Sequence, residues 1–418
     1  MIAKRARIMR FSNEVKLILI SLSIYALVLV IHFIYVRFIN PSFGLMISDQ
    51  IVLYNRGKGI LYGELPYRDF FTNAAPLSPY LWAPLVLISM LGSTDFSNEY
   101  ATTMNITDFQ SLILLSYVFR IFFALCIILS GIILYRLEDK RKNKNVFLIS
   151  LIYTVNPFFL YLVSFWGSDE CIVPLLILLP IYLFERRNNS LATLSIIIGT
   201  GIKYFPIILA PLIWIYGKHW KERIMQTMLF FVGVLSISLP FYFMDPESFL
   251  AQFRDLVGEH GNQGLLTIIQ SVFSVNLNQH NMIFQILTVA IICLLGLFFF
   301  MKRERWDYHK TAALFLVFFL LYPKMQISYI VLVFPFIFVI FLQKGIKRWA
   351  AILFYLSAIV NGEMADILIE GTRDKLHWII LSWINISFFY VTIVILIIIF
   401  IIETKTKFLG IEEKCLFF

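Results

Sequence analysis

Apolar runs of about 20 residues, separated by short basic clusters, recur along the whole 418-residue chain. An α-helix needs about 20 mostly apolar residues to cross the hydrocarbon core of a bilayer. The chain is 60% hydrophobic and only 15% charged, whereas a soluble domain is about half apolar and about one quarter charged. The sequence therefore predicts an all-α, polytopic membrane protein whose helices satisfy their own backbone hydrogen bonds within lipid.

Lys and Arg gather in clusters between the apolar runs, as is typical of the cytoplasmic loops of membrane proteins. Placing these clusters and the N-terminus in the cytoplasm gives about 11 to 13 membrane helices in a single domain, residues 1–418. Two conditions follow. Pro76–Leu91 must lie along the membrane as an interfacial helix, and Leu191–Tyr216 must enter and return as two half-length helices that turn near Lys203.

Two long segments, 37–109 and 245–280, then form the large loops on the non-cytoplasmic side. Half-length helices that meet at a polar turn are tolerated in a membrane only when the turn is buried in protein or lines a cavity. The charge pattern therefore predicts a cleft that opens to the outside near Lys203.

The first outer loop contains two carboxylates that are candidates for chemistry. Asp49 follows the first span closely, and a carboxylate near the membrane surface can take a proton from a hydroxyl group. Asp69 stands in the sequence Tyr67-Arg68-Asp69. A solvated loop with an ordinary Arg–Asp pair is the simpler explanation from residue types alone.

Three cations stand apart from the basic clusters. Lys203 interrupts an apolar run, where a Lys at the bilayer centre costs about 2.5–3.5 kcal/mol on insertion scales. An ammonium group in a cleft is a good partner for a phosphate, although Lys203 could instead snorkel to the outer surface. Lys324 is an isolated cation in an outside turn, and Arg120 lies near the outer interface of its span.

Other polar residues on the same side are candidates for substrate contacts. Asp169 and Glu170 form an acidic pair in the short turn after Trp166, and His260 lies in the second long loop. Loop solvation explains each of them equally well when it is considered alone.

Taken together, these residues resemble the GT-C class of membrane glycosyltransferases. The chain is similar to the mannosyltransferase of GPI-anchor synthesis and to prokaryotic polyprenol-phosphate mannosyltransferases. Three blocks carry the resemblance: Asp49 to Tyr80; Asn156-Pro157 with Trp166-Gly167-Ser168-Asp169-Glu170 and Gly201-Ile202-Lys203-Tyr204-Phe205-Pro206; and, more weakly, Gly261-Asn262-Gln263-Gly264 with Tyr322-Pro323-Lys324-Met325-Gln326.

The resemblance implies a polyprenyl-phosphate-sugar donor, with mannose favoured, and a lipid-linked or glycan acceptor on the non-cytoplasmic face. It implies an inverting transfer with Asp49 as the general base and Asp69 as a second catalytic residue. The residues implied to hold the donor phosphate are Lys203, Arg120 and Lys324. The residues implied to bind substrate are Arg68, Tyr67, Asp169, Glu170 and His260.

The chain departs from the class where many members have a paired acidic motif, because Asp49 is followed here by Gln50. That departure leaves the use of a divalent cation, Mg²⁺ or Mn²⁺, open. The four cysteines show no metal-ligand spacing, so no residue is predicted to ligate a metal.

Broken helices and buried cations also suit a transporter or a lipid flippase, which is the main alternative function. An inert membrane scaffold would not explain Lys203 or the first outer loop. A nucleic-acid-binding function is not expected, because the basic residues flank apolar runs. Short cytoplasmic loops and an Ile- and Lys-rich composition favour a prokaryotic plasma membrane, with membrane lipids as partners and the active site facing outside.

Overall fold

The computed structural model describes residues 2–39, 48–70, 72, 74–91, 109–141, 143–251, 281–301, 308–322, 327–341, 348–359 and 388–399. Within these residues the regular structure is helical and contains no β-strand, which confirms the all-α prediction. The chain divides into two compact units, which are described separately. Unit 1 contains Met1–Ile207 and Tyr216–Phe253, and unit 2 contains Ile208–Ile215 and Arg254–Phe418.

Among the described residues, four helices are long and apolar enough to cross a membrane, so the protein is polytopic. They cover Ser12–Phe38, Ser116–Lys140, Val146–Trp166 and Trp220–Met244. Shorter apolar helices cover Ser78–Met90, Asn189–Ile202, Phe205–Tyr216, Gln285–Phe298, Lys310–Leu321, Arg348–Ile359 and Phe388–Ile399. The total of about 11 to 13 membrane helices stays a prediction, because length alone does not show that a short helix crosses.

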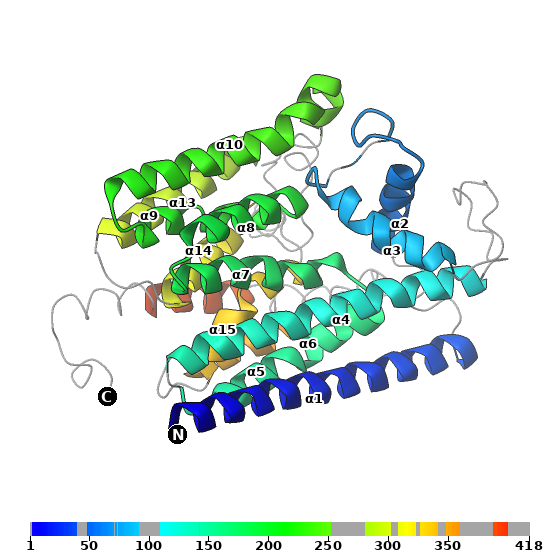
Figure 1. Cartoon of the computed structure of the whole chain (residues 1–418), viewed down its shortest axis with the longest axis horizontal. Coiled ribbons are helices and arrows are strands. Elements are labelled where there is room, and N and C mark those ends of the chain that lie inside the picture. Colours follow the sequence, from blue (N-terminus) through cyan, green and yellow to red (C-terminus); the bar gives the residue numbers. More distant parts are fainter. Residues whose placement is uncertain are drawn as a thin grey trace. The chain divides into compact units, whose positions relative to one another are not determined.

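Unit 1 is a bundle in which α4 packs against α1, α5 and α7, while α8 packs against α7 and α10 (Figure 1). Its elements are α1 (Ile2–Phe38), α2 (Ser48–Leu61), α3 (Ser78–Leu91), α4 (Phe109–Lys140), α5 (Val146–Thr154), α6 (Pro157–Tyr161), the π-helix η2 (Leu162–Trp166), the 3₁₀-helix η3 (Asp169–Ile172), α7 (Val173–Glu185), α8 (Asn189–Ile202) and α10 (Trp220–Met244). The 3₁₀-helix η4 (Phe205–Leu209) follows α8 along the chain.

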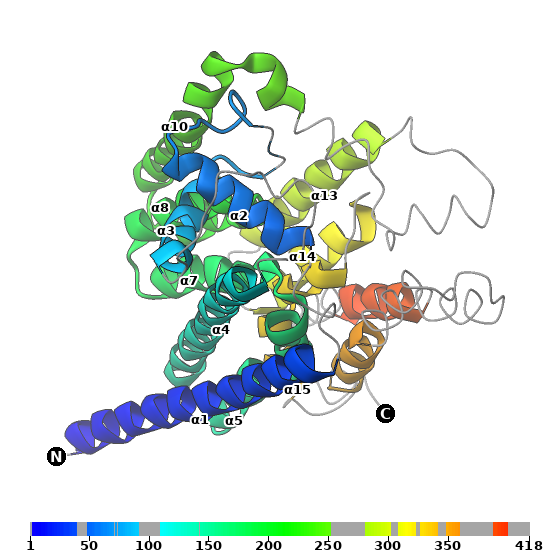
Figure 2. The same ribbon diagram turned by 90° about the vertical axis from the view of Figure 1, so that its right-hand side faces the viewer.

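Unit 2 contains α9 (Pro211–Tyr216) up to Ile215, α13 (Asn281–Met301), α14 (Tyr308–Leu321), the 3₁₀-helix η6 (Ile327–Leu332) and α15 (Phe334–Phe341). In this unit α13 packs against α14, and α14 packs against α15 (Figure 2). The stacked rings of Phe315 and Phe336 lie 6.1 Å apart and are fully buried. Apolar packing of this kind accounts for the described part of unit 2.

The segment predicted to form the first outer loop lies between α1, which ends at Phe38, and α4, which begins at Phe109. The helix α3 matches the predicted interfacial segment Pro76–Leu91. With 14 residues it is about 21 Å long, shorter than the roughly 30 Å hydrocarbon core. The sequence analysis did not predict α2, which packs closely against α3. The first loop is therefore largely a helical hairpin at the end of the bundle (Figure 1).

The span that begins at Val146 is interrupted at Asn156-Pro157, as expected for a proline within a helix. Asn156 caps the new helix, because its side chain accepts a hydrogen bond from Phe159 N at 3.0 Å. The π-helical turn η2 follows and ends at Gly167, which has left-handed backbone angles of 67° and 40°. This turn leads directly into Ser168 and η3.

The run from Asn189 to Tyr216 enters and returns, as the charge pattern predicted. The helix α8 ends at Ile202, and Lys203 is extended. At the other end of the run, Asn189 Nδ2 donates to Tyr216 O at 3.3 Å. The Tyr216 hydroxyl also donates to Glu185 Oε1 at 3.0 Å. The chain therefore turns at Lys203 and comes back to the end from which it started.

The ionic residues of unit 1 gather at two ends of the bundle. At one end, Arg136 pairs with Glu14 at 2.9 Å, and Lys140 pairs with Glu185 at 3.3 Å. Arg120 lies 20 residues before Lys140 on α4, which corresponds to about 30 Å along a helix. Arg120 is therefore separated from the basic end by about the thickness of the hydrocarbon core.

Candidate active site

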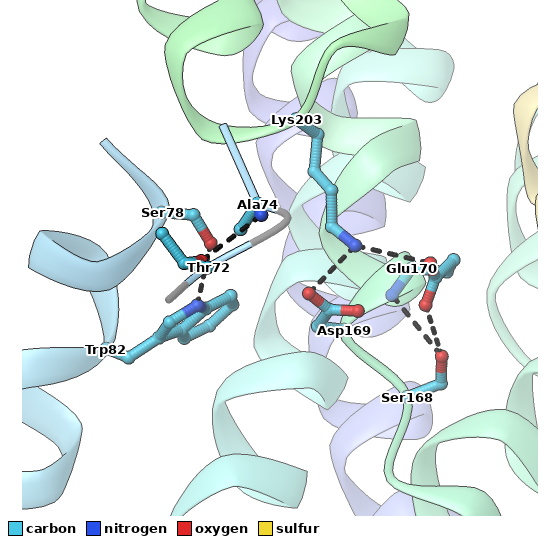
Figure 3. A network of polar contacts seen from close by, with 8 residues as sticks. All are labelled: Thr72, Ala74, Ser78, Trp82, Ser168, Asp169, Glu170 and Lys203. Atoms are coloured by element: carbon cyan, nitrogen blue, oxygen red, sulfur yellow. Dashed lines mark hydrogen bonds and ion pairs between the residues drawn. The ribbon is translucent and has the colours of Figure 1, made fainter. Parts of the chain in front are cut away.

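Lys203 lies between two carboxylates in the interior of unit 1 (Figure 3). Its ammonium nitrogen is 2.8 Å from Asp169 Oδ2 and 3.2 Å from Glu170 Oε1. The side chains of Lys203, Asp169 and Glu170 are only 19%, 11% and 9% exposed. We call these three residues the carboxylate–lysine cluster. It brings together three residues that the sequence analysis had singled out, from two turns that are 33 residues apart.

The local backbone conformation sets the direction in which each of these side chains points. Ser168 caps η3, where its hydroxyl accepts from Glu170 N and donates to the Glu170 carboxylate. Asp169 and Glu170 then occupy the first turn of η3, where the exposed N–H groups of a helix end favour negative charge. Lys203 is at the C-cap of α8, and its extended backbone lets the side chain turn back toward η3.

Burial and charge together set the protonation of the cluster. Burial, together with the negative charge of Glu170, raises the pKa of Asp169 to about 7. Burial also opposes ionisation of Glu170, but the charge of Lys203 outweighs it, so the pKa of Glu170 is lowered. For Lys203, burial disfavours the ammonium form, and the two carboxylates more than offset that cost and raise its pKa. At neutral pH the cluster therefore contains an ammonium, a carboxylate and one carboxyl group that titrates.

The loop between α1 and α4 is fastened beside this cluster. Leu77 N donates to Gly201 O at 2.6 Å, two residues before Lys203. A Cβ atom at Gly201 would lie 2.7 Å from Leu77 Cδ1, so the contact requires a glycine. Nearby, Thr72 and Ser78 supply hydroxyl groups, which accept from Ala74 N and Trp82 Nε1 respectively (Figure 3). The loop therefore brings small polar side chains to the neighbourhood of Lys203.

Tyr67 fastens the same loop to α10. It is 2% exposed, and its ring packs edge-on against Phe241 and Phe249 at 5.6 and 5.2 Å. Its hydroxyl donates to Ala74 O at 2.6 Å. Its backbone φ of 69° is unusual for a residue other than glycine and destabilises the folded state. The packing of the ring offsets this cost. The structure thus places Tyr67 as a core residue of the loop.

Arg68 and Asp69 lie on the surface. Arg68 donates to both carboxylate oxygens of Asp69 at 2.8 and 2.7 Å, and Leu65 N donates to Asp69 Oδ2 at 2.8 Å. These hydrogen bonds, led by those from Arg68, lower the pKa of Asp69 to about 2. A carboxylate with such a low pKa is a weak proton acceptor. Within the described part of the chain, the hydrogen bonds of both side chains are to each other and to Leu65, and they do not reach the carboxylate–lysine cluster.

The remaining predicted residues have different placements. Arg120 is fully buried, and its guanidinium donates to Ser164 O at 2.8 Å and Phe165 O at 3.2 Å. Asp49 is the second residue of α2, and its side chain lies outside the described part of the structure. Lys324 and His260 also lie outside the described residues.

A buried cluster of two carboxylates and a cation, beside a loop that supplies the hydroxyl groups of Thr72 and Ser78, suits the binding of a polar, charged substrate. Residues 100–335, more than half of the chain, match glycosyltransferase family 87. The chain belongs to this family. Family 87 is a GT-C-like family of membrane glycosyltransferases, so the resemblance inferred from the sequence and the transferase activity are both confirmed. No curated protein matches the chain.

The matched region of this family 87 member contains Arg120, Asp169, Glu170 and Lys203, whereas Asp49 and the helical hairpin precede it. The protein is therefore a membrane glycosyltransferase that has a sugar donor and an acceptor as partners. The carboxylate–lysine cluster lies within the part of the chain that defines the family.

The described residues do not fit a divalent cation well. They contain no group of three or more His, Cys, Asp and Glu side chains that could hold a metal ion. Between Asp169 and Glu170, the position that a cation would take is filled by the Lys203 ammonium. The chemistry proposed below therefore has no step that depends on a metal.

Sequence reasoning missed two buried polar residues near the site. Gln50 is bonded to Gly167 and Ser116, and His32 Nδ1 lies 2.8 Å from the Tyr117 hydroxyl. A signal for His32 was present, because a histidine within an apolar span is unusual. Gln50 had no comparable signal, since it stands in a polar stretch of loop.

Proposed function

We propose that this glycosyltransferase moves a sugar, with mannose favoured, from a polyprenyl-phosphate donor to a lipid-linked or glycan acceptor. The transfer takes place on the non-cytoplasmic face of a prokaryotic plasma membrane, and the N-terminus is cytoplasmic. The observation that carries the proposal is the carboxylate–lysine cluster, which lies at the opposite end of α8 from the basic end of unit 1, about 21 Å away along the 14 residues of that helix. The basic end has the composition expected of a cytoplasmic surface.

The reaction is an inverting displacement. The acceptor hydroxyl oxygen attacks the anomeric carbon, and its proton passes to the Asp49 carboxylate, which acts as the general base. The bond between the anomeric carbon and the phosphate oxygen breaks, and polyprenyl phosphate leaves with the electron pair. The position of Asp49 supports this role, because it precedes Gln50, whose side chain is bonded to Gly167 in the turn that leads to Asp169 and Glu170.

Asp69 is a weaker candidate for the base. Its carboxylate is held by Arg68 and by the backbone of Leu65, and its lowered pKa makes proton uptake unfavourable. We therefore propose that Arg68 and Asp69 contact the acceptor as it enters the site. They are not among the groups that react. Tyr67 acts indirectly by holding the loop that carries them.

Lys203 is the proposed ligand of the donor phosphate, assisted by Lys324. With both carboxylates ionised the cluster has one positive and two negative charges, which would repel a phosphate. The raised pKa of Asp169 supports a state in which Asp169 is protonated and Lys203 is balanced by Glu170 alone. In that state the ammonium can stabilise the charge that grows on the leaving phosphate. Asp169, Glu170 and His260 are the proposed ligands of the sugar hydroxyls.

The direct test is transfer of radiolabelled mannose from a polyprenyl-phosphate donor by membranes that contain the wild type or Asp49→Asn. Wild-type membranes are expected to label a lipid or glycan product. Loss of the general base is expected to reduce the rate by about 10²–10⁴-fold. Asp139→Asn, at the basic end of α4, is the matched control and should keep full activity.

Full activity in folded Asp49→Asn would overturn the assignment of the base. No transfer from any of several sugar donors by folded wild type would instead favour a flippase. That alternative predicts movement of a fluorescent lipid-linked sugar across vesicles containing the wild type, and loss of that movement with Lys203→Met.

A further inference from the structure

Gln50 connects the helix that carries Asp49 to two other segments of the site. It follows Asp49 in the first turn of α2 and is 3% exposed. Its Nε2 donates to Gly167 O at 3.3 Å. Its Oε1 accepts from Ser116 Oγ at 2.9 Å and from Arg120 Nη1 at 3.3 Å. Both ends of one amide are therefore engaged by α4 and by the turn after η2.

Gly167 is shaped to receive this amide. It has a left-handed backbone, and a Cβ atom placed there would lie 1.9 Å from Gln50 Nε2. The amide thus fills the space that the absent side chain leaves. Because Gly167 is two residues before Asp169, a displacement of Gln50 would be transmitted to the turn that aims Asp169 and Glu170.

Arg120 contacts both Gln50 and the helix η2. Its guanidinium donates to the carbonyl oxygens of Ser164 and Phe165, which belong to η2, while Nη1 reaches Gln50. The last carbonyls of a helix have no partner within it, so a buried guanidinium stabilises that end. These contacts engage Arg120 with protein oxygens, which fits a structural role better than a phosphate ligand.

We propose that Gln50 is a positioning residue, held by Arg120, Ser116 and Gly167, that fixes the Asp49 end of α2 against the turn bearing Asp169 and Glu170. The inference rests on the proposed function, in which Asp49 is the base and the cluster receives the donor. A base displaced by about 1 Å can cost about 100-fold in rate. Three hydrogen bonds to a buried amide supply the restraint that such a geometry needs.

The kinetic test compares Gln50→Leu with Gln226→Leu. Gln226 is a buried glutamine on α10, 2% exposed and bonded to Ser190, so it is a matched control for the substitution itself. We expect Gln50→Leu to lower kcat by about 10- to 100-fold while KM for the donor stays nearly unchanged. Gln50→Glu keeps an acceptor for Ser116 and Arg120 and should recover part of kcat. Equal kcat in Gln50→Leu and Gln226→Leu would overturn the proposal.

A distance measurement tests the positioning without any transfer. Spin labels at Asn55→Cys on α2 and Leu125→Cys on α4, both exposed, report the distance between these helices in a background that carries Cys293→Ser and Cys415→Ser. A narrow distribution is expected for the parent and for Gln226→Leu, and a broader or shifted one for Gln50→Leu. An unchanged distribution in folded Gln50→Leu contradicts the proposal.

The two tests separate the two hypotheses. If no protein transfers sugar but Gln50→Leu broadens the distance distribution, the proposed donor chemistry fails and the positioning role stands. If Gln50→Leu does not fold, Ser116→Ala removes only the hydroxyl that donates to Gln50 Oε1. This milder variant is expected to lower kcat by a few-fold and to broaden the distribution slightly, and no change in either overturns the proposal.

Discussion

The two ends of unit 1 both contain ion pairs between similar side chains, but the pairs are built differently. At the basic end, the carboxylates of Glu14 and Glu185 are only 12% and 6% exposed, but their partners Arg136 and Lys140 are each 41% exposed. At the other end, Lys203 is 19% exposed and shares its charge between two nearly buried carboxylates. In the first arrangement solvent screens the cations, and each of these carboxylates has a cation of its own. In the second arrangement two carboxylates share one cation, and little solvent reaches any of the three side chains.

This difference separates ion pairs that orient a protein in its membrane from ion pairs that can do chemistry. Exposed pairs contribute about 0–1 kcal/mol to stability, so their residues can vary as long as the net positive charge remains. In a buried cluster each charge depends on its partners, and removal of one leaves another uncompensated. Interactions between buried charges can shift the pKa of a side chain toward neutral pH, where an enzyme can use the group to give or take a proton.

The largest effect on stability is expected from Lys203→Met. This change leaves Asp169 and Glu170 close together without their cation, and breaking a buried pair costs about 3–5 kcal/mol. The thermal unfolding temperature in detergent should fall strongly. The triple variant Lys203→Met, Asp169→Asn, Glu170→Gln should regain much of this stability while sugar transfer remains lost. A Lys203→Met protein as stable as wild type would show that the cluster is not coupled as described.

An intermediate effect is expected from pH. Because the pKa of Asp169 is raised from its ordinary value near 4 to about 7, the folded protein binds a proton at this site that the unfolded protein has released. This contribution to stability is present at low pH and is lost as pH rises from about 4 through 7. Glu170, whose pKa is lowered, acts in the opposite sense at more acidic pH.

The comparison that isolates Asp169 is the unfolding temperature of wild type and Asp169→Asn between pH 5 and 8. The wild type should lose stability relative to Asp169→Asn as pH increases across this window. Parallel curves for the two proteins would show that Asp169 does not titrate there. Asp139→Asn, at the basic end, serves as the control for removal of one carboxylate.

The smallest effect is expected from Arg136→Met. Its pair with Glu14 is bidentate, with distances of 3.0 and 2.9 Å, but Arg136 is 41% exposed. Loss of the pair should cost about 1 kcal/mol or less and leave sugar transfer unchanged. A loss of stability as large as that of Lys203→Met would remove the distinction between the two ends.

The parts of the fold that depend on local pattern were predictable from the sequence. The apolar runs and basic clusters indicated the helices and the return of the chain at Lys203. Lys203 stood out because a cation within an apolar run needs a partner. That its partners are Asp169 and Glu170 was not predictable, because the pairing depends on the packing of α7 against α8.

The roles of Arg120 and Gln50 show where sequence reasoning reached its limit. Arg120 was recognised as unusual, but residue type alone could not distinguish a phosphate ligand from a guanidinium bonded to backbone carbonyls. Gln50 was seen only as the residue that replaces a second acid after Asp49. Its function depends on the left-handed conformation of Gly167, 117 residues later in the chain, and such a contact leaves no periodic signal.

The π-helical turn Leu162–Trp166 has a consequence for how this sequence can change in evolution. A π-turn contains one more residue than the α-turn that it replaces. Deleting that residue would leave an ordinary α-turn with nearly the same rotation and rise, so Asp169 and Glu170 would keep their direction toward Lys203. Deleting a residue from the α-helical part of the span would instead rotate everything after it by about 100° and withdraw it by about 1.5 Å. The segment between Asn156 and Asp169 can therefore lose a residue only within Leu162–Trp166.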